Sequence, residues 1–288
     1  MPHLCLMKVN NMNKLKNNNV MKTSNISSKT IVLIHGLFVN PTSWTEWEAY
    51  FEKLGYNVHT PANLYHEGNP QQLRNQFDPR LPKVDFEQVV MNHVKFIDSL
   101  PEQPILIGHS LGGLIVQKLL SLGKGVAGVT VDGAAPGGII TTKWSFWKSS
   151  FPVIDFFKGN SVFMPSKKWF HYTFGNTLSR EESDKVYEKI AVPESRNIAR
   201  GTLKKFGRID MKKPHQPLLF IAGELDNIIP ADLNRKNFKA YTDKNSIREY
   251  KEFAGRGHYI CGENNWQEVA GYVENWLESI SVQKVKAA

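Results

Sequence analysis

Cysteine is scarce in this chain of 288 residues, which contains only Cys5 and Cys261. Two distant cysteines cannot build a disulfide framework, and neither a CxxC pair nor a zinc-ligand spacing occurs. A disulfide-rich secreted domain is therefore excluded, and we expect no bound metal. The low cysteine content favours a reducing compartment, so we expect a cytoplasmic location.

Long apolar runs are also missing: no stretch approaches the roughly 20 residues that a membrane-spanning helix needs. Internal repeats are absent too, which excludes solenoids and propellers. The remaining composition, with 41% hydrophobic and 22% charged residues, is that of an ordinary globular protein. At this length we expect one large domain or two small ones, without a membrane span.

Acidic residues are missing from residues 1–29, which carry five lysines of a chain whose formal net charge is +9. The remainder carries only +4 and has no aromatic-rich basic motif, so we expect no nucleic-acid partner. Residues 1–29 also lack arginine and an apolar run, which argues against a mitochondrial presequence and a secretory signal. We predict a disordered tail over residues 1–29; an organelle address and a start codon assigned too early remain open.

Short apolar runs alternate with helical patterns through much of the chain. Apolar runs typical of buried strands lie at residues 30–34, 104–109, 125–132 and 218–222. Two further strands are predicted at residues 56–60 and 247–253. Apolar residues at helical spacing predict helices near residues 44–54, 85–100, 111–122 and 266–277. Strands that alternate with helices predict an α/β protein with a doubly wound, mostly parallel β-sheet.

This alternation is interrupted between residues 139 and 207, a segment rich in aromatic and basic residues. It contains a helix start at Ser179, whose hydroxyl can cap the helix while Glu182 completes a capping box. We therefore predict a helical lid, residues 139–207, inserted into a core made of residues 30–138 and 208–282.

The most informative stretch is Gly108-His109-Ser110-Leu111-Gly112, which stands between an apolar run and a helical pattern. A strand that turns at once into a helix holds the serine in a strained backbone conformation and exposes its hydroxyl. The two glycines let the strand and the helix approach closely. The start of the helix also directs free N–H groups and its positive end toward the same point. We therefore predict that Ser110 is a nucleophile.

Four motifs, in this order, resemble the α/β-hydrolase superfamily over residues 30–280: His35-Gly36, the Ser110 pentapeptide, Gly223-Glu224-Leu225-Asp226 and Gly257-His258. The chain order serine, aspartate, histidine is that of the superfamily. The resemblance implies an α/β-hydrolase fold with a helical lid inserted after the sixth strand. It also implies a serine hydrolase of the carboxylic esterase type that needs no organic cofactor.

The chemistry of a serine nucleophile assigns two further roles. Because a serine hydroxyl is a weak nucleophile, a neutral imidazole must take its proton during attack, and His258 is the candidate base. A buried carboxylate must hold that imidazole in the right tautomer, and Asp226, just past a strand, is the candidate acid. Asp132 also ends a strand and remains a rival acid. We expect His35 to brace its loop and His109 to point away from the line of attack.

An oxyanion hole should accompany this triad. Its first donor should be the backbone N–H of Leu111, directly after the nucleophile. For the second donor, similar proteins use the residue after His-Gly, which implies Leu37, with Phe38 as the alternative and as a substrate contact.

Attack by Ser110 implies an acyl-enzyme and hydrolysis of a carboxylic ester, with thioesters and amides left open. The aromatic insertion indicates a small hydrophobic substrate, with Trp144, Trp147 and Phe174 as candidate pocket rings. Two other uses of the same site remain open. One is a lyase, a cofactor-free peroxidase or an acyltransferase, and the other is a non-catalytic ligand-binding relative. The sequence does not indicate the oligomeric state.

Overall fold

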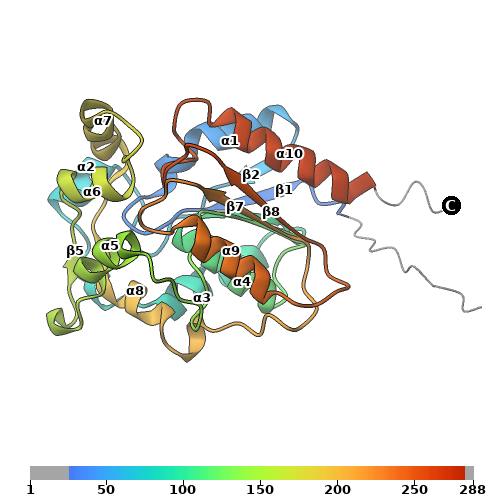
Figure 1. Ribbon diagram of the computed structural model, residues 1–288, viewed down its shortest axis with the longest axis horizontal. Coiled ribbons are helices and arrows are strands. Elements are labelled where there is room, and N and C mark those ends of the chain that lie inside the picture. Colours follow the sequence, from blue (N-terminus) through green and yellow to red (C-terminus); the bar gives the residue numbers. More distant parts are fainter. Residues whose placement is uncertain (1–25, 283–288) are drawn as a thin grey trace, which may run out of the picture.

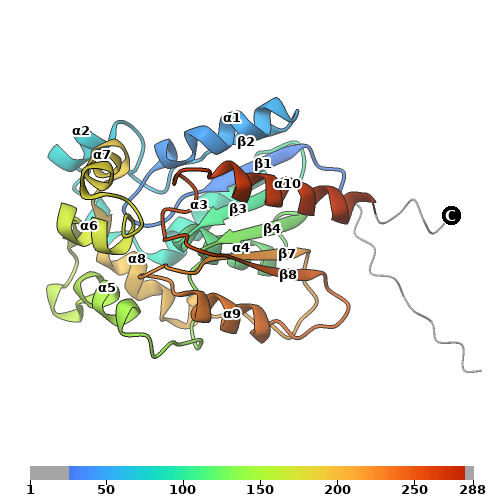
Figure 2. The same cartoon turned by 45° about the horizontal axis from the view of Figure 1, so that its top comes forward.

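The computed structural model describes residues 26–282 and is built on a six-stranded sheet in the order β2-β1-β3-β4-β7-β8. Its strands are β1 Thr30–Ile34, β2 Asn57–His59, β3 Ile105–His109, β4 Ala127–Val131, β7 Leu218–Gly223 and β8 Arg248–Phe253. Every neighbouring pair is parallel. Figure 2 shows the strands side by side, twisting from β2 to β8. The predicted parallel α/β sheet is thereby confirmed.

Helices cover both faces of the sheet (Figures 1 and 2). Helices α1 Thr45–Lys53 and α10 Gln267–Val282 lie on one face, and α3 Phe86–Asp98, α4 Leu111–Ser121 and α9 Ala231–Ala240 lie on the other. Each layer is a separate hydrophobic cluster, one around Trp47 and Trp276 and the other around Val90 and Leu114. The four central strands β1, β3, β4 and β7 are buried along their whole length and read as continuous apolar runs, which is why the sequence revealed them. The edge strands β2 and β8 are partly exposed and carry polar residues.

The insertion, residues 139–207, leaves the sheet after β4 and returns to it at β7. It holds α5 Trp144–Ile154, the 3₁₀ helix η3 Phe156–Lys158, α6 Lys167–Thr173, α7 Arg180–Ile190, α8 Arg196–Thr202 and the 3₁₀ helix η4 Lys205–Gly207. The capping box predicted at Ser179 is present at the start of α7. Strand β4 is the fourth strand of the described sheet, so the predicted position after a sixth strand is corrected to a position after the fourth.

Two features of the fold were not predicted. The insertion contains a small antiparallel pair, β5 Val162–Phe163 with β6 Glu194–Ser195. Strands of two residues carry no periodicity that a sequence pattern could reveal. Residues 61–84, where no helix was predicted, contain α2 Pro70–Asn75 and the 3₁₀ helix η2 Leu81–Lys83. Another 3₁₀ helix, η1 Pro41–Trp44, leads into α1.

Most of the predicted tail, residues 1–25, lies outside the described residues. Residues 26–29 contact the domain rather than leaving it. The backbone N–H of Lys29 donates to the Glu102 carboxylate at 3.0 Å, and the carbonyl of Ile26 accepts from the Ser281 hydroxyl. Residues 26–29 therefore belong with the folded domain, although the prediction assigned them to the tail. Within residues 26–282, no helix combines the length and the apolarity that crossing a membrane would require.

Candidate active site

Ser110 stands at a sharp turn between β3 and α4. Its φ of 57° and ψ of −121° lie in a region that L residues rarely adopt, as expected for a nucleophile elbow. Glycines make the turn possible: a Cβ on Gly108 would lie 2.2 Å from the carbonyl oxygen of Gly112. A Cβ on Gly36 would lie 2.7 Å from the Cβ of Ser110, so the loop after β1 packs directly against the serine.

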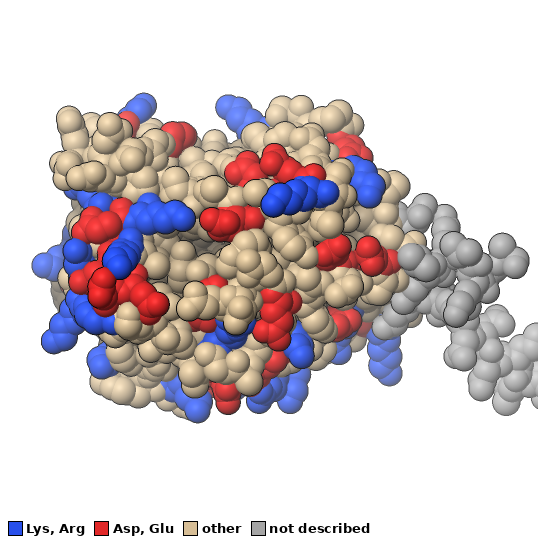
Figure 3. All heavy atoms as spheres, turned by 90° about the horizontal axis from the view of Figure 1, so that it is seen from above, with Lys and Arg blue, Asp and Glu red and all other residues tan. Residues whose placement is uncertain are grey.

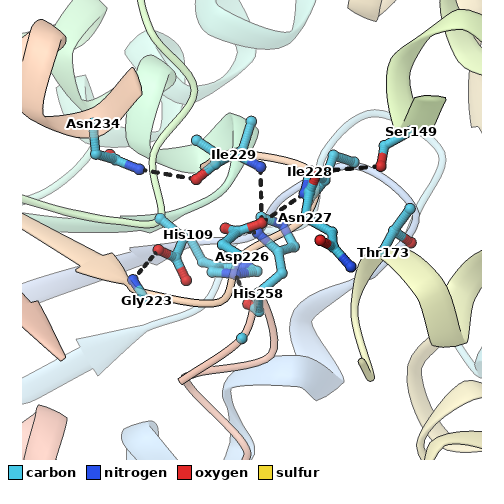
Figure 4. A network of polar contacts seen from close by, with 12 residues as sticks. His109, Ser149, Thr173, Gly223, Asp226, Asn227, Ile228, Ile229, Asn234 and His258 are labelled. Atoms are coloured by element: carbon cyan, nitrogen blue, oxygen red, sulfur yellow. Dashed lines mark hydrogen bonds and ion pairs between the residues drawn. The ribbon is translucent and has the colours of Figure 1, made fainter. Parts of the chain in front are cut away.

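His258 and Asp226 form a buried pair (Figure 4). The Nδ1 of His258 lies 2.6 Å from Oδ2 of Asp226. The other oxygen, Oδ1, accepts the backbone N–H groups of Ile228 at 2.7 Å and Ile229 at 2.8 Å. The carboxylate is thus oriented by its own loop, and it fixes Nδ1 of His258 as the donor. Within the described residues, Nε2 of His258 has no hydrogen-bond partner, which leaves it to accept a proton.

Asp132, the rival acid, is buried close to the same histidine but is bonded elsewhere. Its Oδ1 accepts the backbone N–H of Gly223 at 2.6 Å, and its Oδ2 has no hydrogen-bond partner among residues 26–282. Burial, followed by the nearby charge of Asp226, raises the pKa of Asp132 well above its ordinary value. A carboxyl group that holds its proton is a poor counter-charge for an imidazolium. The geometry therefore favours Asp226 as the orienting acid.

The loop after β1 is held by a buried chain of polar groups. The Nε2 of His35 accepts the backbone N–H of Asn63 at 3.0 Å, while its Nδ1 donates to the carbonyl of Gly36 at 2.9 Å. The ring of His93 donates from Nε2 to Oδ1 of Asn63 at 2.8 Å. Burial lowers the pKa of His35 well below its usual range and that of His93 to about 4, so both rings stay neutral. His35 braces its loop, and Asn63 and His93 are partners that no sequence motif indicated.

Ser110 lies in the wall of a cavity of about 930 Å³, its open mouth included. Leu37, Phe38 and Leu111, the residues assigned to the oxyanion hole and to substrate contact, line the same cavity. Because Leu111 is the first residue of α4, its N–H has no partner within the helix. No charged side chain of the described residues lines this cavity, so it is suited to an apolar group.

The insertion supplies much of the cavity wall. Phe146, on α5, and Phe174, just after α6, both line it. Phe174 also sets its ring edge-on to that of His258, with 4.7 Å between the ring centroids. Trp144 and Trp147 do not line the cavity, and the side chain of Trp144 is mostly exposed. The expectation for these two tryptophans is therefore wrong, because on α5 the inward-facing position falls on Phe146, which lies between them.

The insertion is hydrogen-bonded to the loop that carries Asp226 (Figure 4). The hydroxyl of Ser149, on α5, donates to the carbonyl of Asn227, and the Asn227 amide donates to the carbonyl of Tyr172, on α6. The loop that carries His258 is attached as well, because the N–H of Tyr259 donates to the carbonyl of Phe174 at 3.2 Å. The positions of Asp226 and His258, the candidate acid and base, thus depend on how the insertion packs.

One group of side chains in the described residues has the spacing of a metal site. His109, Asp132 and His258 each offer a ligand atom, and these atoms lie within 4.8 Å of one another. Each histidine already engages one ring nitrogen: His109 Nε2 faces the carbonyl of His258, and His258 Nδ1 faces Asp226. The expectation that the site works without a metal stays a prediction.

A model of the α/β-hydrolase family matches residues 31–271, which include all four motifs. Among curated proteins, the search returned no match. Solved structures resemble the chain over most of its length. One is a monoacylglycerol lipase from Paleococcus ferrophilus, at 18% identity and a TM-score of 0.65, covering 90% of this chain and 97% of that one.

Two further solved structures are similar. An extracellular α/β-hydrolase from a Paenibacillus species shares 23% identity at a TM-score of 0.63, covering 85% of this chain and 98% of that one. A polyneuridine aldehyde esterase shares 15% identity at a TM-score of 0.61, covering 87% of this chain and 99% of that one. At these identities the likeness establishes the fold, and the roles of individual residues rest on the geometry above.

Proposed function

Because the chain belongs to the α/β-hydrolase family, we propose that it is a serine hydrolase that cleaves a carboxylic ester of a small hydrophobic substrate. The observation that carries the proposal is the buried pair of Asp226 and His258. Asp226 has both oxygens engaged and fixes Nδ1 of His258, while Nε2 of His258 is left without a partner. A serine nucleophile requires a histidine whose tautomer is fixed and whose Nε2 can accept the hydroxyl proton.

In the proposed reaction, Nε2 of His258 takes the proton of the Ser110 hydroxyl as its Oγ attacks the ester carbonyl. The N–H groups of Leu37 and Leu111 stabilise the negative charge on the carbonyl oxygen. The tetrahedral intermediate then expels the alcohol, which receives the proton from His258, and leaves an acyl group on Ser110. Water attacks this acyl-enzyme with His258 again as the base, which releases the carboxylic acid and restores the serine.

The neutral, apolar cavity supports a hydrophobic substrate, because a charged acyl or alcohol group would lose its hydration there without a partner. The names of the similar solved structures, a lipase and an esterase among them, agree with ester chemistry. The proposal includes a reducing compartment such as the cytoplasm, because the chain carries only two cysteines and no disulfide framework.

A panel of p-nitrophenyl esters, from acetate to palmitate, tests the proposed reaction with the wild-type protein and Ser110→Ala. We expect turnover by the wild type, a loss of several orders of magnitude in Ser110→Ala, and labelling of the wild type alone by a fluorophosphonate probe. A folded wild-type protein that takes up the probe but hydrolyses no ester would point to another use of the serine. A protein that neither reacts with the probe nor turns over any ester would contradict the proposal.

The choice of acid is tested by Asp226→Asn and Asp132→Asn, measured on the same short ester. We expect Asp226→Asn to lower kcat by roughly 10³-fold to 10⁴-fold, because the amide favours the wrong imidazole tautomer. Asp132→Asn should keep most of the activity, because the Asp132 carboxyl group is bonded to Gly223 and not to His258, and its raised pKa makes it the weaker counter-charge. The reverse order of effects would show that Asp132 is the orienting acid.

A further inference from the structure

Large apolar side chains are exposed mainly on the insertion. Seven of the twelve exposed large hydrophobic residues of the described chain lie within residues 139–207. Six of these are more than half exposed: Ile140, Trp144, Phe151, Phe156, Phe157 and Leu203. Soluble monomers rarely gather aromatic rings on one exposed region unless that region binds something.

These six residues lie on neighbouring elements. Five are on α5 or directly beside it, and Leu203 follows α8. Helices α5 and α8 lie side by side at the same lower-left corner in Figures 1 and 2. The guanidinium of Arg200, on α8, donates to the carbonyls of Ile154 and Gly159 and so fastens α8 to the end of α5. We call the surface formed by these six residues and the lysines beside them the α5–α8 face. Its lysines are Lys143, Lys158, Lys204 and Lys205.

The charges on the α5–α8 face are almost all positive. Lys143, Lys158, Lys204 and Lys205 are exposed, and none of them forms an ion pair within residues 26–282. Asp155, the one acidic residue between positions 139 and 169, uses its carboxylate to accept the N–H of Phe157. The face shown in Figure 3 instead intersperses acidic and basic side chains.

The cavity opens within the α5–α8 face. Ile140 and Leu203 are both exposed and both line the cavity that contains Ser110. The exposed apolar surface is thus continuous with the apolar lining of the cavity at these two residues.

We propose that the α5–α8 face binds the surface of an anionic lipid bilayer. Aromatic rings that enter the headgroup region, flanked by lysines that meet lipid phosphates, are the features of a helix that lies in a membrane surface. Trp144 is suited to this position, because indole rings favour the interface. A second copy of the chain fits less well, since a symmetric contact would bring the unpaired lysines of both copies together. Given the proposed hydrolase activity, the bilayer is also the source of the ester.

Co-sedimentation of the full-length protein with vesicles tests this surface. We expect binding to vesicles of equal parts phosphatidylglycerol and phosphatidylcholine, and weak binding to phosphatidylcholine alone. The double variant Phe156→Ser/Phe157→Ser should reduce the partition coefficient about tenfold or more, and Lys158→Glu/Lys204→Glu about tenfold. Matched controls are Leu122→Ser and Lys53→Glu, at exposed positions at the far ends of α4 and α1, which should bind like the wild type. All variants retain residues 1–25, so the lysines there cannot account for a difference.

The outcomes separate this inference from the proposed reaction. Ser110→Ala should bind vesicles as well as the wild type, because binding does not need the nucleophile. Equal vesicle binding by the wild type and both double variants would contradict the proposal that the α5–α8 face binds membranes, even if the protein hydrolyses esters. The proposal would also be contradicted if the wild type is a dimer that does not bind vesicles and the Phe156→Ser/Phe157→Ser variant is a monomer. That result would assign the α5–α8 face to contact with a second copy of the chain.

Discussion

The Nε2–H of His109 donates a 2.7 Å hydrogen bond to the backbone carbonyl of His258. His109 directly precedes Ser110, the proposed nucleophile, so this bond joins the serine turn to the loop that carries His258, the proposed base. Burial, followed by the proximity of His258, lowers the pKa of His109 to about 3, so its ring remains a neutral donor. Trp44 and Phe174 hold the ring by edge-on contacts. If His258 is the base, as proposed, His109 is expected to position it through this bond.

Replacing His109 with phenylalanine should misplace the base while keeping a ring in the core. We expect His109→Phe to lower kcat on a short ester by roughly 10-fold to 100-fold with little change in KM, since small misplacements of a catalytic group are costly. The variant His109→Gln, which keeps an N–H donor, should recover part of the loss. Steady-state kinetics of both variants decide the question, and a wild-type kcat in His109→Phe would remove the positioning role.

Gly36 should be essential for the nucleophile although it has no side chain. A Cβ there would lie 2.7 Å from Ser110 Cβ and 3.2 Å from its Oγ, so Gly36→Ala must displace the serine or the loop. We expect kcat to fall at least about 100-fold, with slower fluorophosphonate labelling of Ser110. The matched control is Gly271→Ala on α10, where a Cβ meets only Tyr50 Oη at 3.6 Å. Similar rates for the two variants would contradict the tight packing.

The sequence was informative where one backbone requirement admits few residue types. Gly108 and Gly112 could be assigned because only glycine permits a strand and a helix to approach so closely. The four central strands could be located because burial on both faces requires continuous apolar residues. Ser110, Asp226 and His258 each follow a parallel strand of the sheet, so their convergence could be inferred from the topology.

The rest of the site depends on contacts between distant segments. Nothing in the sequence indicates that Asn63 joins His35 to His93, because a single asparagine in a proline-rich loop has many possible partners. The sequence also could not predict which aromatic ring of α5 faces the cavity. The helix is apolar on several sides, so its sequence does not distinguish Phe146, which lines the cavity, from the exposed Trp144.

The buried His93 should make the protein less stable in mild acid. Burial lowers its pKa from 6.5 to about 4, so below about pH 6.5 the unfolded chain binds a proton that the folded chain does not. The stability present above that pH is lost as the pH falls toward 4, by up to roughly 3 kcal/mol from this residue. His93→Gln keeps a donor for Asn63 but cannot titrate. Urea unfolding between about pH 4.5 and about pH 7 should therefore show a shallower loss for this variant. If the free energy of unfolding falls equally with pH in the wild type and in His93→Gln, the pKa of His93 is not lowered by folding.

Phe146 should select substrate size, because its ring lines the cavity while its α5 neighbour Trp144 is mostly exposed. Removing the ring enlarges the cavity away from the reacting atoms, so Phe146→Ala should favour long acyl esters over acetate and leave kcat on acetate nearly unchanged. Trp144→Ala is the matched control for loss of an aromatic ring from the same helix.

The measurement is the ratio of kcat/KM for a long ester to kcat/KM for acetate. It is made without detergent, at ester concentrations below those at which the long ester aggregates. We expect a rise of about tenfold for Phe146→Ala, which corresponds to one or two methylene groups of additional apolar contact, and no rise for Trp144→Ala. Equal loss on both esters in Phe146→Ala would show that the ring supports the packing of the insertion and not the selection of substrate.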